Sequence, residues 1–329
     1  MRILLIQTAF IGDVILATAL LEELAARRRG DRVDVLVRKG NEHLLDNHPH
    51  VHRVLCWDKK SGKYRNLLAL FKEIQLRSYD CIINLQRFGA TGLLTAFTGA
   101  RARVGFAKNP FSFAYTRKLP HRIDPTGPFV HEIDRNRALI AHLLPAGAPR
   151  RLPQLYPSVA DYQRTRVVGP YVCVAPTSVW FTKQWPAERW TTLLDSLPAD
   201  HAIHLLGAPG DRAACEAIIA ASGRPDALNR AGELSFLESA ALMQHARMSY
   251  VNDSAPLHLA TAVNGPVTAI FCSTVPGFGF TPLSDRSHVV ETTLPLPCRP
   301  CGLHGRRRCP EGHFRCAEIE IDRVRGRLS

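Results

Sequence analysis

The acidic residue Asp13 comes directly after a strongly apolar segment near the N-terminus. Residues 2–7 form an apolar run, which is typical of a buried parallel strand, and Thr8-Ala9-Phe10-Ile11-Gly12-Asp13 follows it. Ligands of parallel α/β sheets gather at the carboxyl ends of the strands, and Gly12 allows the backbone to approach a ligand closely. Asp13 is therefore a candidate general base for an attacking hydroxyl; the alternative is a simple cap of the next helix.

A second polar segment, Pro176–Pro186, follows the strand expected at residues 171–175. Lys183 brings a positive charge that suits a diphosphate. The hydroxyl donors of the segment are Thr177, Ser178 and Thr182. A surface lysine beside a packed tryptophan is the alternative, but the position at a strand end favours an anion-binding site.

A third segment reads Tyr250-Val251-Asn252-Asp253-Ser254-Ala255-Pro256-Leu257-His258-Leu259-Ala260. It predicts a short strand, a polar turn and a helix, with Asp253 or Ser254 as the cap and Pro256 in the first turn. Free N–H groups at the start of such a helix bind phosphates, and His258 would lie one turn further on. The alternative is an ordinary capped helix that binds nothing.

Asp211 ends the glycine-containing turn Gly207-Ala208-Pro209-Gly210-Asp211, after the strand expected at residues 202–206. Its carboxylate either holds a ribose hydroxyl or caps its own helix. No G-x-G-x-x-G or Walker A pattern occurs at the first strand end, which argues against dehydrogenases and P-loop NTPases.

These segments belong to an alternation of strands and helices that predicts doubly wound parallel sheets. The expected strands are 2–7, 33–37, 51–56, 81–85, 171–175, 202–206, 248–251 and 267–271. The expected helices are 14–29, 67–75, 131–144, 187–197, 211–221, 236–245 and 256–263. A chain of 329 residues suits two domains. The linker region 145–170 is rich in proline, glycine and arginine, so we predict domains at 1–150 and 151–329.

The stretch 99–127 breaks this rhythm with basic residues interleaved with aromatic ones. Its cations are Arg101, Arg103, Lys108, Arg117, Lys118 and Arg122. The net charge of +13 favours anionic partners, and no nucleic-acid-binding motif accompanies it. No apolar run approaches the length of a membrane span and no signal peptide is evident, so we expect a cytoplasmic protein whose contact with a membrane is peripheral.

Four of the nine cysteines cluster near the C-terminus with the spacing Cys298-x2-Cys301-x7-Cys309-x6-Cys316. Four thiols so spaced can close a tetrahedral zinc or iron site, which would fix the 298–316 tail and take no part in catalysis. The spare candidate ligands are His304 and His313. Unligated thiols, or two disulfides formed on oxidation, are the alternatives.

The ordered set of motifs resembles glycosyltransferase family 9, the lipopolysaccharide heptosyltransferases. The motifs that carry the resemblance are Ile11-Gly12-Asp13-Val14, Thr182-Lys183-Gln184-Trp185-Pro186, Leu234–Leu242 and Asn252–Ala260. The resemblance implies a GT-B fold of two Rossmann-like domains facing a central cleft, with the acceptor on the N-terminal domain and a donor of the ADP-heptose type mainly on the C-terminal one. It also implies inversion at the anomeric carbon, with no metal or other cofactor in catalysis.

The resemblance further implies roles for individual residues. Asp13 deprotonates the acceptor hydroxyl, while Lys183 and the helix N-terminus at Ser254–Pro256 offset the charge of the departing ADP. The residues expected to bind the donor are Gly12, Thr177, Ser178, Thr182, Lys183, Asp211, Asp253, Ser254, Ala255, Pro256 and His258. Ser254-Ala255 replaces the usual Thr-Gly of the family, so the exact donor sugar is open.

The six cations of the 99–127 stretch are the expected acceptor-binding residues. These cations would bind the phosphates and acidic sugars of a lipopolysaccharide core, and the interleaved aromatic residues would contact the surface of the inner membrane. A solvated basic loop is the alternative.

Three other functions stay open at this level. One is a nucleotide-sugar or glycan-binding protein without activity. Another is a family 9 enzyme that uses a different sugar or an acceptor other than lipopolysaccharide. A zinc-containing nucleic-acid binder is the third, and only the tail cysteines and the net charge favour it.

Overall fold

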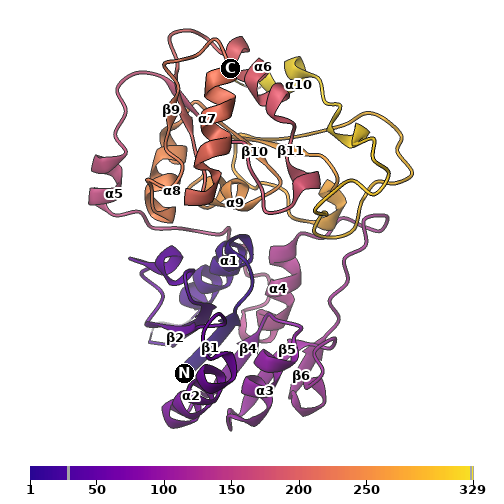
Figure 1. The fold of residues 1–329 in the computed structure, drawn as a ribbon. Coiled ribbons are helices and arrows are strands. Elements are labelled where there is room, and N and C mark those ends of the chain that lie inside the picture. The colour runs from indigo at the N-terminus through magenta and orange to yellow at the C-terminus, as the bar shows by residue number, and fades with distance from the viewer. Residues whose placement is uncertain (28–29, 327, 329) are drawn as a thin grey trace. The chain divides into compact units, whose positions relative to one another are not determined.

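The chain folds into two compact units. The computed structural model describes residues 1–27, 30–326 and 328. Unit 1 comprises Met1–Ile123 and Val130–Tyr156, and unit 2 comprises Asp124–Phe129 and Pro157–Ser329. Figure 1 shows the two units, each with its own sheet and helices. The change of unit after Tyr156 lies close to the boundary predicted at residue 150.

Unit 1 is built on a parallel sheet with the strand order β3-β2-β1-β4-β5-β6. Its strands are β1 (Arg2–Gln7), β2 (Arg32–Arg38), β3 (Arg53–Trp57), β4 (Cys81–Asn84), β5 (Ala102–Phe106) and β6 (Arg117–Leu119). Its α-helices are α1 (Ile11–Arg27), α2 (Lys63–Arg77), α3 (Gly89–Phe97) and α4 (Glu132–Ile140). In the central register, Ile3 pairs with Val33 on one side and Cys81 on the other.

Unit 2 repeats this topology with the order β12-β11-β10-β7-β8-β9. Its strands are β7 (Tyr171–Ala175), β8 (Ala202–Leu205), β9 (Leu228–Asn229), β10 (Met248–Asn252), β11 (Val267–Phe271) and β12 (Ser287–Glu291). Its α-helices are α5 (Val159–Arg164), α6 (Ala187–Ser196), α7 (Arg212–Ala221), α8 (Phe236–His245), α9 (Ala255–Ala262) and α10 (Ile321–Arg325). The predicted class, two Rossmann-like doubly wound sheets of the GT-B type, is confirmed.

The predicted break in rhythm at 99–127 is wrong, because β5 and β6 continue the alternation there. Both strands lie toward one edge of the sheet, and the three-residue β6 is the edge strand itself. Edge strands carry exposed charged side chains, which blunt pairing with other chains. Arg117 and Lys118 on β6 are exposed in this way, so β6 lacks the apolar run that marks a central strand. β5 lies between β4 and β6, and Arg103 and Gly105 interrupt its apolar residues.

Two tryptophans form the centre of the unit 2 core. Trp185 and Trp190 are almost fully buried and meet edge to face, with ring centroids 5.2 Å apart. The indole N–H of Trp185 donates to the carbonyl of Ala317 over 3.1 Å, which ties the C-terminal tail to this core. The loop that carries Lys183 therefore ends on a rigid support.

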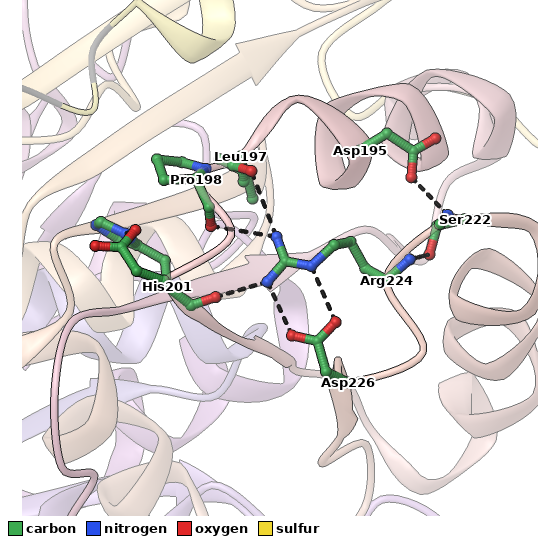
Figure 2. A network of polar contacts seen from close by, with 9 residues as sticks. Asp195, Leu197, Pro198, His201, Ser222, Arg224 and Asp226 are labelled. Carbon is green, nitrogen blue, oxygen red and sulfur yellow. Dashed lines mark hydrogen bonds and ion pairs between the residues drawn. The ribbon is translucent and has the colours of Figure 1, made fainter.

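Arg224 ties together the loops at the amino edge of the unit 2 sheet. Figure 2 shows its guanidinium among the carbonyls of the turn before β8 and the carboxylate of Asp226. It donates to the carbonyl of His201 over 2.8 Å and to Asp226 over 2.9 and 3.0 Å, with longer bonds to Leu197 and Pro198. Arg224 is only 8% exposed, so it has a structural role at the edge where the strands begin.

We predict that Arg224→Ala lowers the free energy of unfolding by about 2–3 kcal/mol, because several buried carbonyls lose a charged donor. The exposed Arg166, replaced in the same way, should change it by less than about 0.5 kcal/mol. Urea unfolding of the two variants measures the difference. An Arg224→Ala protein as stable as the Arg166→Ala protein would contradict the structural role.

No helix in the described part of the chain is long and apolar enough to cross a membrane.

Candidate functional site

The site in unit 2 lies where the strand order of the sheet reverses. β7 and β10 are neighbours there, and the chain leaves them in opposite directions across the sheet. Loops at the carboxyl ends of such a pair form the usual ligand crevice of doubly wound folds. The loop after β7 contains Lys183, and the turn after β10 contains Asp253, as the sequence predicts.

Lys183 and Asp253 form a mostly buried ion pair at this point. The Lys183 Nζ lies 2.7 Å from Oδ2 of Asp253, and the side chains are 15% and 8% exposed. The hydroxyl of Thr274 donates to the same oxygen over 2.6 Å. A cation with so little water around it interacts strongly with anionic groups, so Asp253 holds the Lys183 ammonium in a fixed position at this strand end.

Asn252 joins the two loops, and the sequence prediction did not include it. Its Oδ1 accepts from the backbone N–H of Trp185 over 2.9 Å, and its Nδ2 donates to the carbonyl of Pro176 over 2.8 Å. The side chain is fully buried. An asparagine at the end of a fully buried strand is the signal that points to such a role.

Helix α9 begins at Ala255 with Pro256 in its first turn, as expected. Neither predicted cap works as one, because Ser254 makes no capping bond and Asp253 is turned to Lys183. The half-buried Ser254 hydroxyl and the backbone N–H groups of the first turn are thus the anion-binding groups that this turn offers. His258 is buried one turn into the helix.

The three predicted hydroxyls after β7 separate into two groups. Thr177 and Ser178 are half-buried and directly follow the strand, where a ligand phosphate is expected. Thr182 is fully buried, and its hydroxyl accepts from the backbone N–H of Arg306 over 2.7 Å. Thr182 therefore does not fit the predicted role as a direct donor contact.

Asp211 precedes α7, but its side chain makes no capping hydrogen bond to that helix, so the predicted cap of its own helix is not formed. Its Oδ2 accepts from the backbone N–H of Ala208 over 2.7 Å, within the same turn. One carboxylate oxygen of Asp211 is thus engaged within its own turn, and the role in binding a ribose hydroxyl stays a prediction.

Asp13 lies at the equivalent reversal in unit 1, between β1 and β4. It is half-buried in the first turn of α1. Burial raises the pKa of its carboxyl to about 6, and the negative charge of Glu132 adds to the rise. Nearby backbone N–H groups and Arg87 act in the opposite direction. A carboxylate with this pKa is ionised at neutral pH and is a stronger base than a solvated one, as general-base catalysis requires.

Glu132, which shapes the environment of Asp13, was not predicted from the sequence. Burial alone would raise the pKa of Glu132, but hydrogen bonds and charge from His121 and Arg135 lower it. His121 Nε2 lies 3.1 Å from its carboxylate, and Arg135 Nε lies 2.7 Å away. Glu132 thus stays negative and disfavours the charged form of Asp13.

The rate of a reaction that uses Asp13 as base should fall in acid. Only the deprotonated form accepts a proton, so kcat/KM should drop about tenfold for each pH unit below about 6 and level off above it. A pH–rate profile measures this dependence. A profile that is flat between pH 5 and pH 8 would contradict the role of Asp13.

A sequence model of glycosyltransferase family 9 (heptosyltransferase) matches residues 67–307, which is more than half of the chain. The chain belongs to this family. The family 9 enzyme is 27% identical over 321 residues to lipopolysaccharide heptosyltransferase 1 of Pseudomonas aeruginosa, with 92% of this chain and 86% of the relative covered.

Other similar proteins are also heptosyltransferases. Lipopolysaccharide heptosyltransferase 3 of Escherichia coli is 26% identical over 280 residues, covering 80% of this chain and 82% of that protein. The solved structure of E. coli ADP-heptose lps heptosyltransferase II superposes with a TM-score of 0.79 at 22% identity, covering 100% and 97% of the two chains. The family 9 enzyme therefore shares its fold with a solved heptosyltransferase.

The structure does not bring together all six cations predicted for the acceptor of the family 9 enzyme. Parallel strands begin at one edge of a sheet and end at the other, so Arg101, before β5, lies at the edge away from Asp13. The Arg103 guanidinium donates to the carbonyls of Ala100 and Ala114, which does not fit the predicted acceptor role. Arg117 and Lys118 are exposed on β6.

Lys108 and Arg122 remain as the acceptor candidates on the Asp13 side of the sheet. Lys108 follows β5 and Arg122 follows β6, so they come after the carboxyl ends of their strands. Both side chains are exposed. Exposed cations at this edge are suited to an anionic acceptor.

The predicted metal site has no support from the geometry of the tail. Within the described residues, no three His, Cys, Asp or Glu side chains are arranged to hold a metal ion. The Sγ of Cys298 lies 3.8 Å from Nε2 of His313, and the thiol of Cys301 donates to the carbonyl of Cys298. Cys309 is half-buried and Cys316 is buried, and both are free thiols.

Proposed function

We propose that this family 9 enzyme transfers a heptose from ADP-heptose to an inner-core sugar of lipopolysaccharide, or to a related anionic glycan, with inversion at the anomeric carbon. The observation that carries the proposal is the Lys183 ammonium, held by Asp253 at the start of α9. A buried cation beside helix N–H groups suits a leaving diphosphate. The names of the relatives, which include lipopolysaccharide heptosyltransferases and an ADP-heptose enzyme, support this choice of donor and acceptor.

In the proposed reaction, the acceptor hydroxyl oxygen forms a bond to the anomeric carbon of the heptose. The bond from that carbon to the β-phosphate oxygen breaks, and ADP departs with the electron pair. Asp13 takes the proton of the hydroxyl. Lys183, the Ser254 hydroxyl and the first turn of α9 stabilise the charge that develops on ADP, with Thr177 and Ser178 as further phosphate contacts. Each step is thus assigned to a side chain or helix end of this chain.

On the acceptor side, we propose that Lys108 and Arg122 hold phosphate or carboxylate groups of the glycan. The connection between β5 and β6, which contains Lys108, also contains aromatic side chains: Phe113 is 73% exposed, and Phe111 contacts Phe113 and Phe97. Aromatic rings beside exposed cations suit the headgroup region of an anionic membrane. We therefore place the enzyme on the inner face of the inner membrane, as a peripheral protein.

Mass spectrometry of reaction products tests the proposal. The purified enzyme is incubated with ADP-heptose, ADP-glucose or UDP-glucose, and with phosphorylated or dephosphorylated inner-core acceptors. We expect a heptose adduct from ADP-heptose that is reduced when the acceptor lacks phosphate. ADP binding without any product would favour the inactive binding protein, and a product only with another sugar would overturn the choice of donor.

A further inference from the structure

The cysteine-rich tail packs directly against the loop that carries Lys183. Thr182, the neighbour of Lys183, forms two hydrogen bonds with the backbone of Arg306. The Thr182 N–H donates to the Arg306 carbonyl over 3.1 Å, and the Thr182 hydroxyl accepts from the Arg306 N–H over 2.7 Å. The Thr182 hydroxyl also lies 3.0 Å from that of Ser273, and its carbonyl accepts from the Ser273 N–H. Thr182 is thereby fixed on two sides.

Gly305 lies against the side chain of Lys183 itself. Its φ of +77° is in the left-handed region, and a Cβ built on it would be 2.8 Å from Cγ of Lys183 and 3.2 Å from the Thr182 hydroxyl. A contact below 3 Å at the second carbon of the stem forces the lysine to move. A side chain at position 305 would therefore displace the Lys183 stem from its present position, and only glycine fits beside it without strain.

The same tail segment is anchored to the loop after β11. Arg299 donates to the carbonyls of Cys272 and Thr274, each over 2.7 Å, and forms an ion pair with Glu291 at 2.6 Å. The Cys301 N–H donates to the Ser273 carbonyl over 3.0 Å. Because Thr274 bonds Asp253, the segment supports both partners of the Lys183–Asp253 pair.

We infer that residues 299–306 of the tail are a positioning element of the donor site, and that Gly305 and Thr182 are its positioning residues for Lys183. The inference rests on the proposed diphosphate role of Lys183. It gives the tail a part in sugar transfer, whereas the sequence predicts only a structural one.

The test compares Gly305→Ala with Gly312→Ala. Gly312 lies in the same tail at a similar φ of +73° but has no atom within 4 Å of a built Cβ, so it carries the same backbone strain without the contact. We expect Gly305→Ala to raise the Kd for ADP and the KM for ADP-heptose about tenfold or more, since a displaced cation loses its alignment with the phosphates. The Kd of Gly312→Ala should match that of the wild type.

A second pair of variants keeps the test independent of the folding of Gly305→Ala. Thr182→Val removes the hydroxyl that joins Arg306 to Ser273 and should weaken ADP binding, whereas Thr182→Ser keeps it and should restore the affinity. Wild-type ADP affinity in both Gly305→Ala and Thr182→Val would overturn the inference. Lys183→Met, measured alongside, separates the two proposals: if it alone loses ADP affinity, the proposed function stands without the positioning element, and if it binds ADP normally, the diphosphate role fails.

Discussion

Replacing Asp13 with asparagine should lower kcat by about 10²–10⁴-fold and leave the affinity for ADP unchanged. Asparagine keeps the shape of the side chain but cannot accept a proton from the acceptor hydroxyl. Asp13 belongs to unit 1, whereas the proposed ADP-binding groups belong to unit 2. Single-turnover transfer assays and calorimetric titration with ADP measure the two quantities separately.

Asp13→Glu is the matched control for this prediction. It retains a carboxyl group one methylene further from the backbone, so it should recover part of the rate. The acid limb near pH 6 should persist in Asp13→Glu, with its midpoint moved, and be absent from any residual activity of Asp13→Asn. Near-normal turnover by Asp13→Asn would show that another group, or the water of the site, takes the proton.

The fold was predictable where burial is continuous along an element. Residues 3–6 of β1 and 172–175 of β7 are almost fully buried, and such strands appear in a sequence as plain apolar runs. β6 was missed because edge strands carry charge, as Lys118 does, and β5 was missed because Arg103 and Gly105 interrupt its apolar residues. The continuity of the apolar run thus decided which strands could be predicted from the sequence.

Within the candidate site, residue types were predictable but partners were not. The sequence marks Lys183 and Asp253 as ligand-site residues, and the structure shows that they bind each other. Thr182 was assigned to the donor as a hydroxyl in the segment after the strand, but its partner Arg306 is 124 residues further along the chain. No local pattern encodes a contact of that range, which is why the tail was assigned only a metal-binding role.

Replacing Lys183 should change both ADP affinity and stability, because its ammonium and the Asp253 carboxylate form a mostly buried ion pair. Lys183→Met keeps most of the volume of the stem but removes the ammonium. It should raise the Kd for ADP roughly 10- to 100-fold, because a hydrogen bond to a charged group contributes about 1.5–3 kcal/mol and each 1.4 kcal/mol is about tenfold in Kd. It should also lower the free energy of unfolding by about 3 kcal/mol, because the Asp253 carboxylate is left buried without its cation.

The double variant Lys183→Met with Asp253→Asn distinguishes two causes of weak ADP binding. Asparagine removes the uncompensated negative charge, so unfolding titrations should show most of the stability restored. If the ammonium itself binds the diphosphate, the Kd for ADP stays high in the double variant. If the double variant instead binds ADP as the wild type does, the loss in Lys183→Met came from repulsion between Asp253 and the phosphates, and the lysine acts only as a counter-charge to that carboxylate.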